Sequence, residues 1–358
     1  MIIPSYRRYR ALLGLVILAA LPRVIAAQGQ APAPAPSGPQ ISVGGLSYFQ
    51  YYYMLNKNAN GINANNFQLT RAYINIMAKL SGGVSARITP DIYQLASDST
   101  LNYRLKYAYV AFNPSGGPLT WKLGVTQTPL LDWEEALWDY RVQGTMPMER
   151  NGYVTSSDLG AGVDGNFNHE KVDLQAGVFN GEGYSKSNTG DQGKDVMARI
   201  SFRLMDTDND SRVGGLRLTV YGQYGQPTTT GTRQRFLGLL SYRSNKVLLA
   251  GEYATTADSV HTTAKKVTGS VASVYGWYQL AAKLRVIARV DQWDPNTNVD
   301  NNKQTRTIIG LAYHVTSNFR VLADWDNVKF EGDGTTTPPS TATKSTASQA
   351  LLQMQFNF

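Results

Sequence analysis

The C-terminal stretch LLQMQFNF, residues 351–358, alternates apolar and polar side chains. In an extended strand every second side chain shares a face, so Leu352, Met354, Phe356 and Phe358 lie on one side and three amide side chains on the other. The apolar face is too hydrophobic for a solvated sheet, and the amide face is too polar for a protein core. The stretch therefore predicts a strand of a transmembrane β-barrel, with lipid on one face and water on the other.

The same two-faced pattern recurs back along the chain to about Ile41. We identify sixteen such segments, which start near Ile41, Phe67, Val84, Asn102, Leu119, Leu159, Val172, Asp195, Leu216, Arg233, Lys246, Val267, Leu284, Gln304, Phe319 and Gln349. Short connections such as SGG at 81–83 alternate with long polar ones such as KNANGINANN at 57–66, as in barrels with short periplasmic turns and long outer loops. The expected fold is all-β: an antiparallel transmembrane β-barrel of sixteen strands over residues 41–358.

One connection breaks the alternation of loop lengths. MDTDNDSRVGG, residues 205–215, is long where a short turn is expected, which leaves the strand count open by two. The spacing of Asp206, Asp208 and Asp210 also invites a calcium-loop reading. That reading requires Gly at the sixth position and Glu at the twelfth, where this chain has Ser211 and Arg217. We therefore expect a long solvated periplasmic turn and no metal site.

The N-terminus has the form of an export signal. A basic start is followed by the apolar run ALLGLVILAALP and by small residues suited to cleavage, so residues 1–27 are expected to be a signal peptide. Residues 28–40 are rich in Ala and Pro and are expected to form an extended periplasmic tether. Loss of the four signal-peptide arginines lowers the formal net charge from +8 to +4. The chain has no cysteine, which suits passage through an oxidising compartment.

Strand phases separate charged from apolar residues. In the strand from Asn102, one phase contains Tyr103, Leu105, Tyr107 and Tyr109 and the other Arg104, Lys106, Ala108 and Val110. Because a charge on the lipid side costs about 2–4 kcal/mol at the midplane, the charged phase is expected to face inward. The expected pore-lining bases are Arg71, Lys79, Arg87, Arg104, Lys106, Lys122, Arg199, Arg203, Arg217, Arg285, Arg289, Arg306 and Arg320. The expected inward acids are Asp91, Asp158, Asp164, Asp173, Glu252, Asp291, Asp324 and Asp326, which leaves the wall positive and attractive to anions.

The longest connection, residues 129–157, has no strand pattern and is the expected third loop of the barrel. Two placements compete: an outer lid over the mouth, or a loop folded into the lumen as a constriction. Its aromatic residues Trp133, Trp138 and Tyr140 could pack it against the wall, which favours the inner position. Its charged residues are five acids and two bases: Asp132, Glu134, Glu135, Asp139, Glu149, Arg141 and Arg150. An acidic loop opposite a basic wall would produce a transverse field and weaken simple anion selectivity.

Other folds and chemistries fit the sequence less well. A soluble β-sandwich could show the same alternation but would not explain the alternating loop lengths or the terminal Phe. Catalysis lacks support, because His169, His261 and His314 have no accompanying nucleophile motif. Three scattered histidines without cysteine make no metal site, no cofactor motif is present, and nucleic-acid binding is not expected because bases and aromatics occupy opposite faces. A plugged barrel that serves as an anchor or adhesin stays open, as does an outer-membrane enzyme.

Several motifs together resemble the phosphate-selective porin O and P family of outer-membrane porins. They are FQLTRAYINIMAKL, KLGVTQTPLLDWEE, MPMERNGY, SSDLGAGVDG, VDLQAGVFNGEG, ARVDQWDPN, TIIGLAYHVTSNFRVLADWDNV and the terminal QFNF, in that order over nearly the whole mature chain. The resemblance implies a trimeric, sixteen-stranded channel in the bacterial outer membrane with an inward third loop, and a terminal Phe358 read by the barrel-assembly machinery. The chain departs from the phosphate-specific members because it lacks a dense lysine run and its constriction loop is net acidic. The expected function is passive diffusion of small hydrophilic solutes and ions, with a preference for anions.

Overall fold

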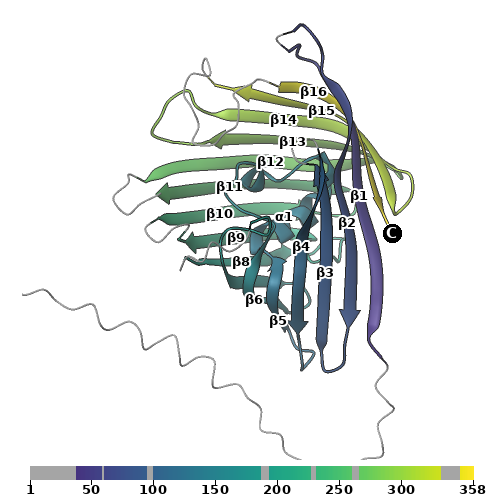
Figure 1. The fold of residues 1–358 in the computed structure, drawn as a ribbon, viewed down its shortest axis with the longest axis vertical. Coiled ribbons are helices and arrows are strands. Elements are labelled where there is room, and N and C mark those ends of the chain that lie inside the picture. The colour runs from purple at the N-terminus through teal and green to yellow at the C-terminus, as the bar shows by residue number, and fades with distance from the viewer. Residues whose placement is uncertain are drawn as a thin grey trace, which may run out of the picture. The chain divides into compact units, whose positions relative to one another are not determined.

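The barrel is a single closed sheet of sixteen antiparallel strands in a computed structural model that describes residues 38–58, 60–94, 100–186, 193–226, 231–259, 266–331 and 347–358. Each strand pairs with its neighbours in the chain, and β1 pairs with β16 to close the ring (Figure 1). The strands are β1 Gln40–Met54, β2 Asn65–Lys79, β3 Val84–Gln94, β4 Leu101–Phe112, β5 Leu119–Gln127, β6 Ser157–Phe167, β7 Val172–Phe179, β8 Asp195–Met205, β9 Gly215–Gly225, β10 Thr232–Arg243, β11 Val247–Ser259, β12 Val267–Ala281, β13 Leu284–Asp294, β14 Gln304–His314, β15 Phe319–Phe330 and β16 Ala347–Asn357.

The predicted architecture is confirmed, and every predicted strand start lies within two residues of the observed one. The long connection at 205–215 joins β8 to β9 and changes no strand count. Gln40, the last residue of the expected tether, already belongs to β1. The expected signal peptide at 1–27 and the remainder of the tether up to residue 37 lie outside the described residues.

Along most strands, exposed side chains that face outward alternate with buried side chains that face inward. On β10, Phe236 and Leu240 are 58% and 53% exposed, whereas Leu237 and Leu239 between them are buried. The outward set is apolar around the ring, and such an exterior is stable in hydrocarbon rather than in water. Among the described residues, no helix is long and apolar enough to cross a membrane.

The two-residue period fails on β4, where the register with β3 shifts between Thr89 and Pro90. The shift is a bulge that leaves Lys106 without a partner residue on β3 and places Tyr107 on the same side as Lys106. Tyr107 is accordingly buried, and the guanidinium carbon of Arg87 lies 4.3 Å from its ring centre. The predicted outward phase is therefore wrong for Tyr107 and Tyr109. In the sequence, Pro90 indicates this bulge, because proline cannot donate a backbone hydrogen bond to the neighbouring strand.

The connection between β5 and β6 folds into the barrel (Figure 1). It contains α1 Pro129–Trp138, a 3₁₀ turn η1 Arg141–Gln143, and the short helix α2 Pro147–Arg150. Pro129 suits the first helical position, and Asp139 ends α1 in a left-handed conformation with φ 62°. Trp133, Leu137 and Trp138 are completely buried, since they pack with inward residues of the wall. The inner placement of the third loop is thus confirmed, and the outer lid is not observed.

Candidate functional site

Arginines of the wall hold the backbone of the inner loop. Arg199 on β8 donates to the carbonyl of Pro129 at 3.0 Å. Arg243 on β10 donates to the carbonyls of Ala136 and Leu137, at 2.7 and 3.0 Å, at the C-terminal end of α1. The carbonyls of Ala136 and Leu137 are among those that the C-terminal end of a helix leaves without hydrogen bonds, and a cation at that end also complements the helix dipole.

The aromatic side chains of the loop meet the same arginines. The ring of Trp133 has the guanidinium carbon of Arg199 at 4.3 Å, that of Arg217 at 5.3 Å and that of Arg212 at 5.6 Å. Cation–π contacts of this kind are strongest where water is excluded, and Trp133 is completely buried. Trp138 packs edge-on against Tyr275 of β12. One side of the lumen is therefore filled by the docked loop.

Four of the five acids of the inner loop form ion pairs with arginines. Asp132 pairs with Arg212 of the long turn between β8 and β9 at 2.7 Å, and Asp139 pairs with Arg320 at 3.2 Å. Glu135 and Glu149 both pair with Arg141 at 2.8 Å. These four acids therefore sit in local ion pairs, and the open transverse field that the sequence predicts is reduced at their positions.

The pKa shifts in the loop follow from these contacts. Burial raises the pKa of Asp132, but Arg212, Lys122 and Arg199 together outweigh this effect, and the net pKa falls below the usual value. Burial likewise opposes Arg141, yet Glu149 and Glu135 hold its pKa above the usual value. Burial raises the pKa of Glu134 well above its usual value, and the nearby Glu252 raises it further. Glu134 forms no ion pair among the described residues, and its burial therefore favours the neutral acid.

The wall formed by β2 to β5 carries bases interleaved with tyrosines. Arg71 and Arg104 share Asp91, which is completely buried, at 3.4 and 2.8 Å. Lys106 donates to Ser156 at the end of the loop and lies 4.7 Å from the ring centre of Tyr184. The aromatic faces and shared carboxylate allow like charges to gather on this wall.

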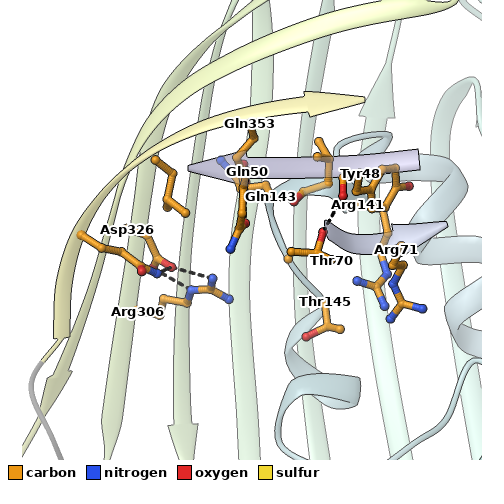
Figure 2. Close-up of a pocket in the computed structure, with 14 residues that line it drawn as sticks. Tyr48, Gln50, Thr70, Arg71, Arg141, Gln143, Thr145, Arg306, Asp326 and Gln353 are labelled. Carbon is orange, nitrogen blue, oxygen red and sulfur yellow. Dashed lines mark hydrogen bonds and ion pairs between the residues drawn. The ribbon is translucent and has the colours of Figure 1, made fainter. Parts of the chain in front are cut away.

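A cavity of about 270 Å³ lies between η1 and the part of the wall formed by β1, β2 and β14 to β16 (Figure 2). Three guanidinium groups line it, those of Arg71, Arg141 and Arg306, against the single carboxylate of Asp326. Arg306 and Asp326 form a two-bond pair at 2.8 and 2.7 Å. The remaining lining is mainly amide, hydroxyl and backbone, so the cavity is polar and its lining has more cationic than anionic groups.

The thirteen basic residues predicted to line the pore fall into three groups according to what they contact. Arg71 and Arg306 line the 270 Å³ cavity. Arg199, Arg217 and Arg289 are completely or almost completely buried; Arg199 and Arg289 lie against the inner loop, and Arg217 donates to the carbonyls of Gly214 and Glu170. The others lie elsewhere: Arg87 with Asn75 and Thr89, Arg104 with Asp91, Lys106 with Ser156, Lys122 with Asp164, Arg203 with Asp206, Arg285 with Tyr140, Arg320 with Asp139, and Lys79 exposed at the end of β2.

Sequence reasoning missed several cations. Arg233 and Arg235 on β10 pair with Asp195 and Asp258 and line a second cavity of about 680 Å³ near the long-loop end. Their phase also contains the buried Leu237 and Leu239, and these apolar residues hid the inward face of β10. Arg243 shares that phase, so strict alternation along β10 would have found all three. Arg212 lies in a turn, where no period applies.

The two described histidines join no catalytic cluster. His169 lies in the turn between β6 and β7 with φ 55°, and His314 contacts the hydroxyl of Tyr140 at 3.1 Å. His261 lies outside the described residues. Within the described part of the chain, no group of three or more His, Cys, Asp or Glu side chains is arranged to hold a metal ion.

Neither a protein-family model nor a curated protein sequence matches the chain. Solved structures do match over most of its length. The anion-selective porin from Comamonas acidovorans superposes with a TM-score of 0.67 at 12% identity, over 89% of this chain and 100% of that chain. The outer-membrane channel DcaP of Acinetobacter baumannii gives 0.61 at 13% identity, over 90% and 98%.

A third match is OmpT of Vibrio cholerae, an outer membrane protein described in its trimer form, with a TM-score of 0.63 at 11% identity over 90% of this chain and 100% of that chain. Identities this low establish the fold alone. The fold is that of the sixteen-stranded outer-membrane porins.

Proposed function

We propose that the chain is a porin of the bacterial outer membrane, a passive water-filled channel for small hydrophilic solutes and ions that prefers anions. One observation carries the proposal: a closed barrel with an apolar exterior encloses an inner loop and, beside it, a polar cavity lined by three arginines and one aspartate. Charge selects ions only where the passage approaches the Debye length of about 8 Å, and an inner loop supplies that narrowing.

The distribution of ion pairs supports the preference for anions. Arg87 contacts Asn75, Thr89 and the ring of Tyr107, with no carboxylate in direct contact among the described residues. Arg150 makes no ion pair within the described part of the chain, and burial together with Arg306 lowers its pKa only to about 10, so it stays charged at neutral pH. These cations are not locally neutralised by acids, and mobile anions would balance them.

Several finer features of the proposal are inferred from resemblance to other outer-membrane proteins. A homotrimer agrees with the trimer form of the Vibrio structure, and a preference for phosphate follows only from the motifs shared with the phosphate-selective family. Recognition of Phe358 by the barrel-assembly machinery likewise follows only from the resemblance to the phosphate-selective family. No enzymatic role, cofactor, metal or nucleic-acid partner is proposed, and contact with outer-membrane lipid follows from the apolar exterior.

Planar bilayers test the channel directly. Purified protein should give stepwise conductance, whereas an intact barrel without steps would favour an enzyme or a plugged anchor. In a salt gradient, the sign of the reversal potential should show anion selectivity, and a cation-selective sign would contradict the preference. Replacement of Arg104, Lys106 and Lys122 by Gln should shift the potential toward cations. The matched control is Lys246→Gln in the exposed turn before β11, which should leave it unchanged.

A further inference from the structure

The 270 Å³ cavity is lined by the guanidinium groups of Arg71 and Arg141, whereas the acids that pair with them, Asp91, Glu135 and Glu149, do not belong to its lining. Figure 2 shows the guanidiniums of Arg71 from β2 and Arg141 from η1 side by side. Each keeps free donors, because Arg141 uses Nε and Nη2 for Glu135 and Glu149, and Arg71 uses Nη1 for Tyr73 and Asp91. Among the described contacts, Arg141 Nη1 and Arg71 Nη2 are unused. A carboxylate is the planar anion that two such donors match.

Next to this pair the cavity is lined by amides. Gln143 is almost completely buried, faces the Asp324 carboxyl, and makes no side-chain hydrogen bond of good geometry. Gln353 donates to Gln50 at 3.0 Å and leaves its own Oε1 without a partner. An amide side chain offers one donor group and one acceptor, which suits the hydroxyls of a polyol, and unused buried amides are costly unless a solute or water satisfies them.

The dimensions limit the solute. The amides lie between the Arg71 and Arg141 pair and the Arg306–Asp326 pair on the opposite side of the cavity (Figure 2). A volume of about 270 Å³ is at the small end for ligand pockets, so one small molecule fits. Asp326 lines the cavity beside its partner Arg306, whereas the acids paired with Arg71 and Arg141 do not line it, so only the end formed by Arg71 and Arg141 presents cations without a carboxylate in the lining. The chemistry is therefore that of a single carboxylate attached to a hydroxylated body.

We propose that this cavity binds hydroxylated monocarboxylates of the sugar-acid class, with the carboxylate on Arg71 and Arg141 and the hydroxyl groups along Gln143 and Gln353. The inference rests on the proposed channel, since the solute reaches the cavity through the lumen. Binding must be weak enough to release the solute, so the affinity falls in the millimolar range. The site gives the anion preference a specific solute class.

The test measures block of the chloride current through the full-length protein in planar bilayers by D-glucuronate, with acetate and D-glucose as matched probes. Glucuronate should reduce the current at a concentration at least about tenfold below either control, because only it uses both the guanidinium pair and the amides. Equal block by acetate would overturn the hydroxyl contacts, and equal block by glucose would overturn the carboxylate contact. Conductance steps without any selective block defeat the site alone, whereas absence of steps defeats the channel itself.

Two variants with the same charge change separate this site from general wall charge. Arg71→Gln should raise the half-blocking concentration of glucuronate about tenfold, because it removes a charge-assisted bond. Arg104→Gln removes the other partner of Asp91 but does not line the cavity, and should change that concentration less than about twofold. Gln143→Met should reduce the preference for glucuronate over acetate while Arg71 stays in place. Equal effects of Arg71→Gln and Arg104→Gln would contradict the site.

Discussion

At the scale of single residues, the closure of the barrel depends on a glycine. The backbones of Gly45 and Phe358 exchange hydrogen bonds of 3.0 and 3.1 Å, next to the β1–β16 ladder. A Cβ on Gly45 would lie 2.2 Å from the Phe358 ring, which is closer than real Cβ contacts. The terminal aromatic ring therefore covers β1 only because that position has no side chain.

Gly45→Val should therefore hinder closure of the barrel. Overpacking of this kind costs about 1–3 kcal/mol, since either the ring or the strand must move. The measurement is the fraction of protein that refolds into detergent with heat-modifiable mobility on a gel. Gly238→Val on β10 is the control, because a Cβ there meets nothing within 4 Å. If both variants refold equally, the ring adapts and the contact does not direct closure.

At the scale of elements, the inner loop contains a buried pair of acids. Glu134 of α1 is completely buried and Glu252 of β11 nearly so, and the structure gives neither carboxyl a hydrogen bond. The hydroxyl of Tyr275 lies near Glu252, and Arg289 with its partner Asp291 lies beyond them. Two carboxyl groups in such surroundings do not both ionise, because burial and mutual repulsion oppose a second negative charge.

The docking of α1 should accordingly weaken as pH rises. The pKa of Glu134 is raised in the folded state, so the folded protein holds the proton more tightly and its advantage is complete below the unfolded value of about 4.5. That advantage is lost as pH increases through the raised folded pKa. Cleavage of the loop by trypsin should become faster in that range, and Glu134→Gln should remove the change. Glu135→Gln, which alters the same helix, should retain it.

The long turn between β8 and β9 acts as a second support for the loop. Its Arg212 donates to both the carbonyl and the carboxylate of Asp132, at 2.8 and 2.7 Å. Arg212→Gln should destabilise loop docking by about 1 kcal/mol or less, because both side chains are partly exposed to solvent. The effect should be present at neutral pH and vanish as acid protonates Asp132, whose pKa is lowered in the folded protein. A variant with unchanged trypsin sensitivity at pH 7 would show that the turn does not support the loop.

At the scale of the whole molecule, periodicity predicted the ring of strands but not the roles of its charges. Strand starts follow from two-residue alternation, which β8 to β15 keep over most of their length. Whether an inward arginine lines the cavity or binds the inner loop depends on where α1 lies. The alternation of residue types along a strand gives no information on that position. The bulge beside Pro90 shows the same limit, because one extra residue reverses the faces of Tyr107 and Tyr109. The local pattern thus predicts which side a residue faces, and tertiary packing decides what it meets there.

The exterior of the barrel should be sensitive to charge according to depth in the bilayer. Ile309 and Tyr313 face outward from β14 and are 50% and 49% exposed, but Ile309 lies near mid-strand and Tyr313 next to the turn. Ile309→Arg should lower the free energy of unfolding in lipid vesicles by about 2–4 kcal/mol, and Tyr313→Arg by only about 0–1 kcal/mol, because the cost of a cation falls from the bilayer midplane to the interface. Urea unfolding of both variants measures the difference. A soluble protein would tolerate both substitutions equally, so equal and small losses would show that this face does not contact hydrocarbon and would remove the basis for a transmembrane channel.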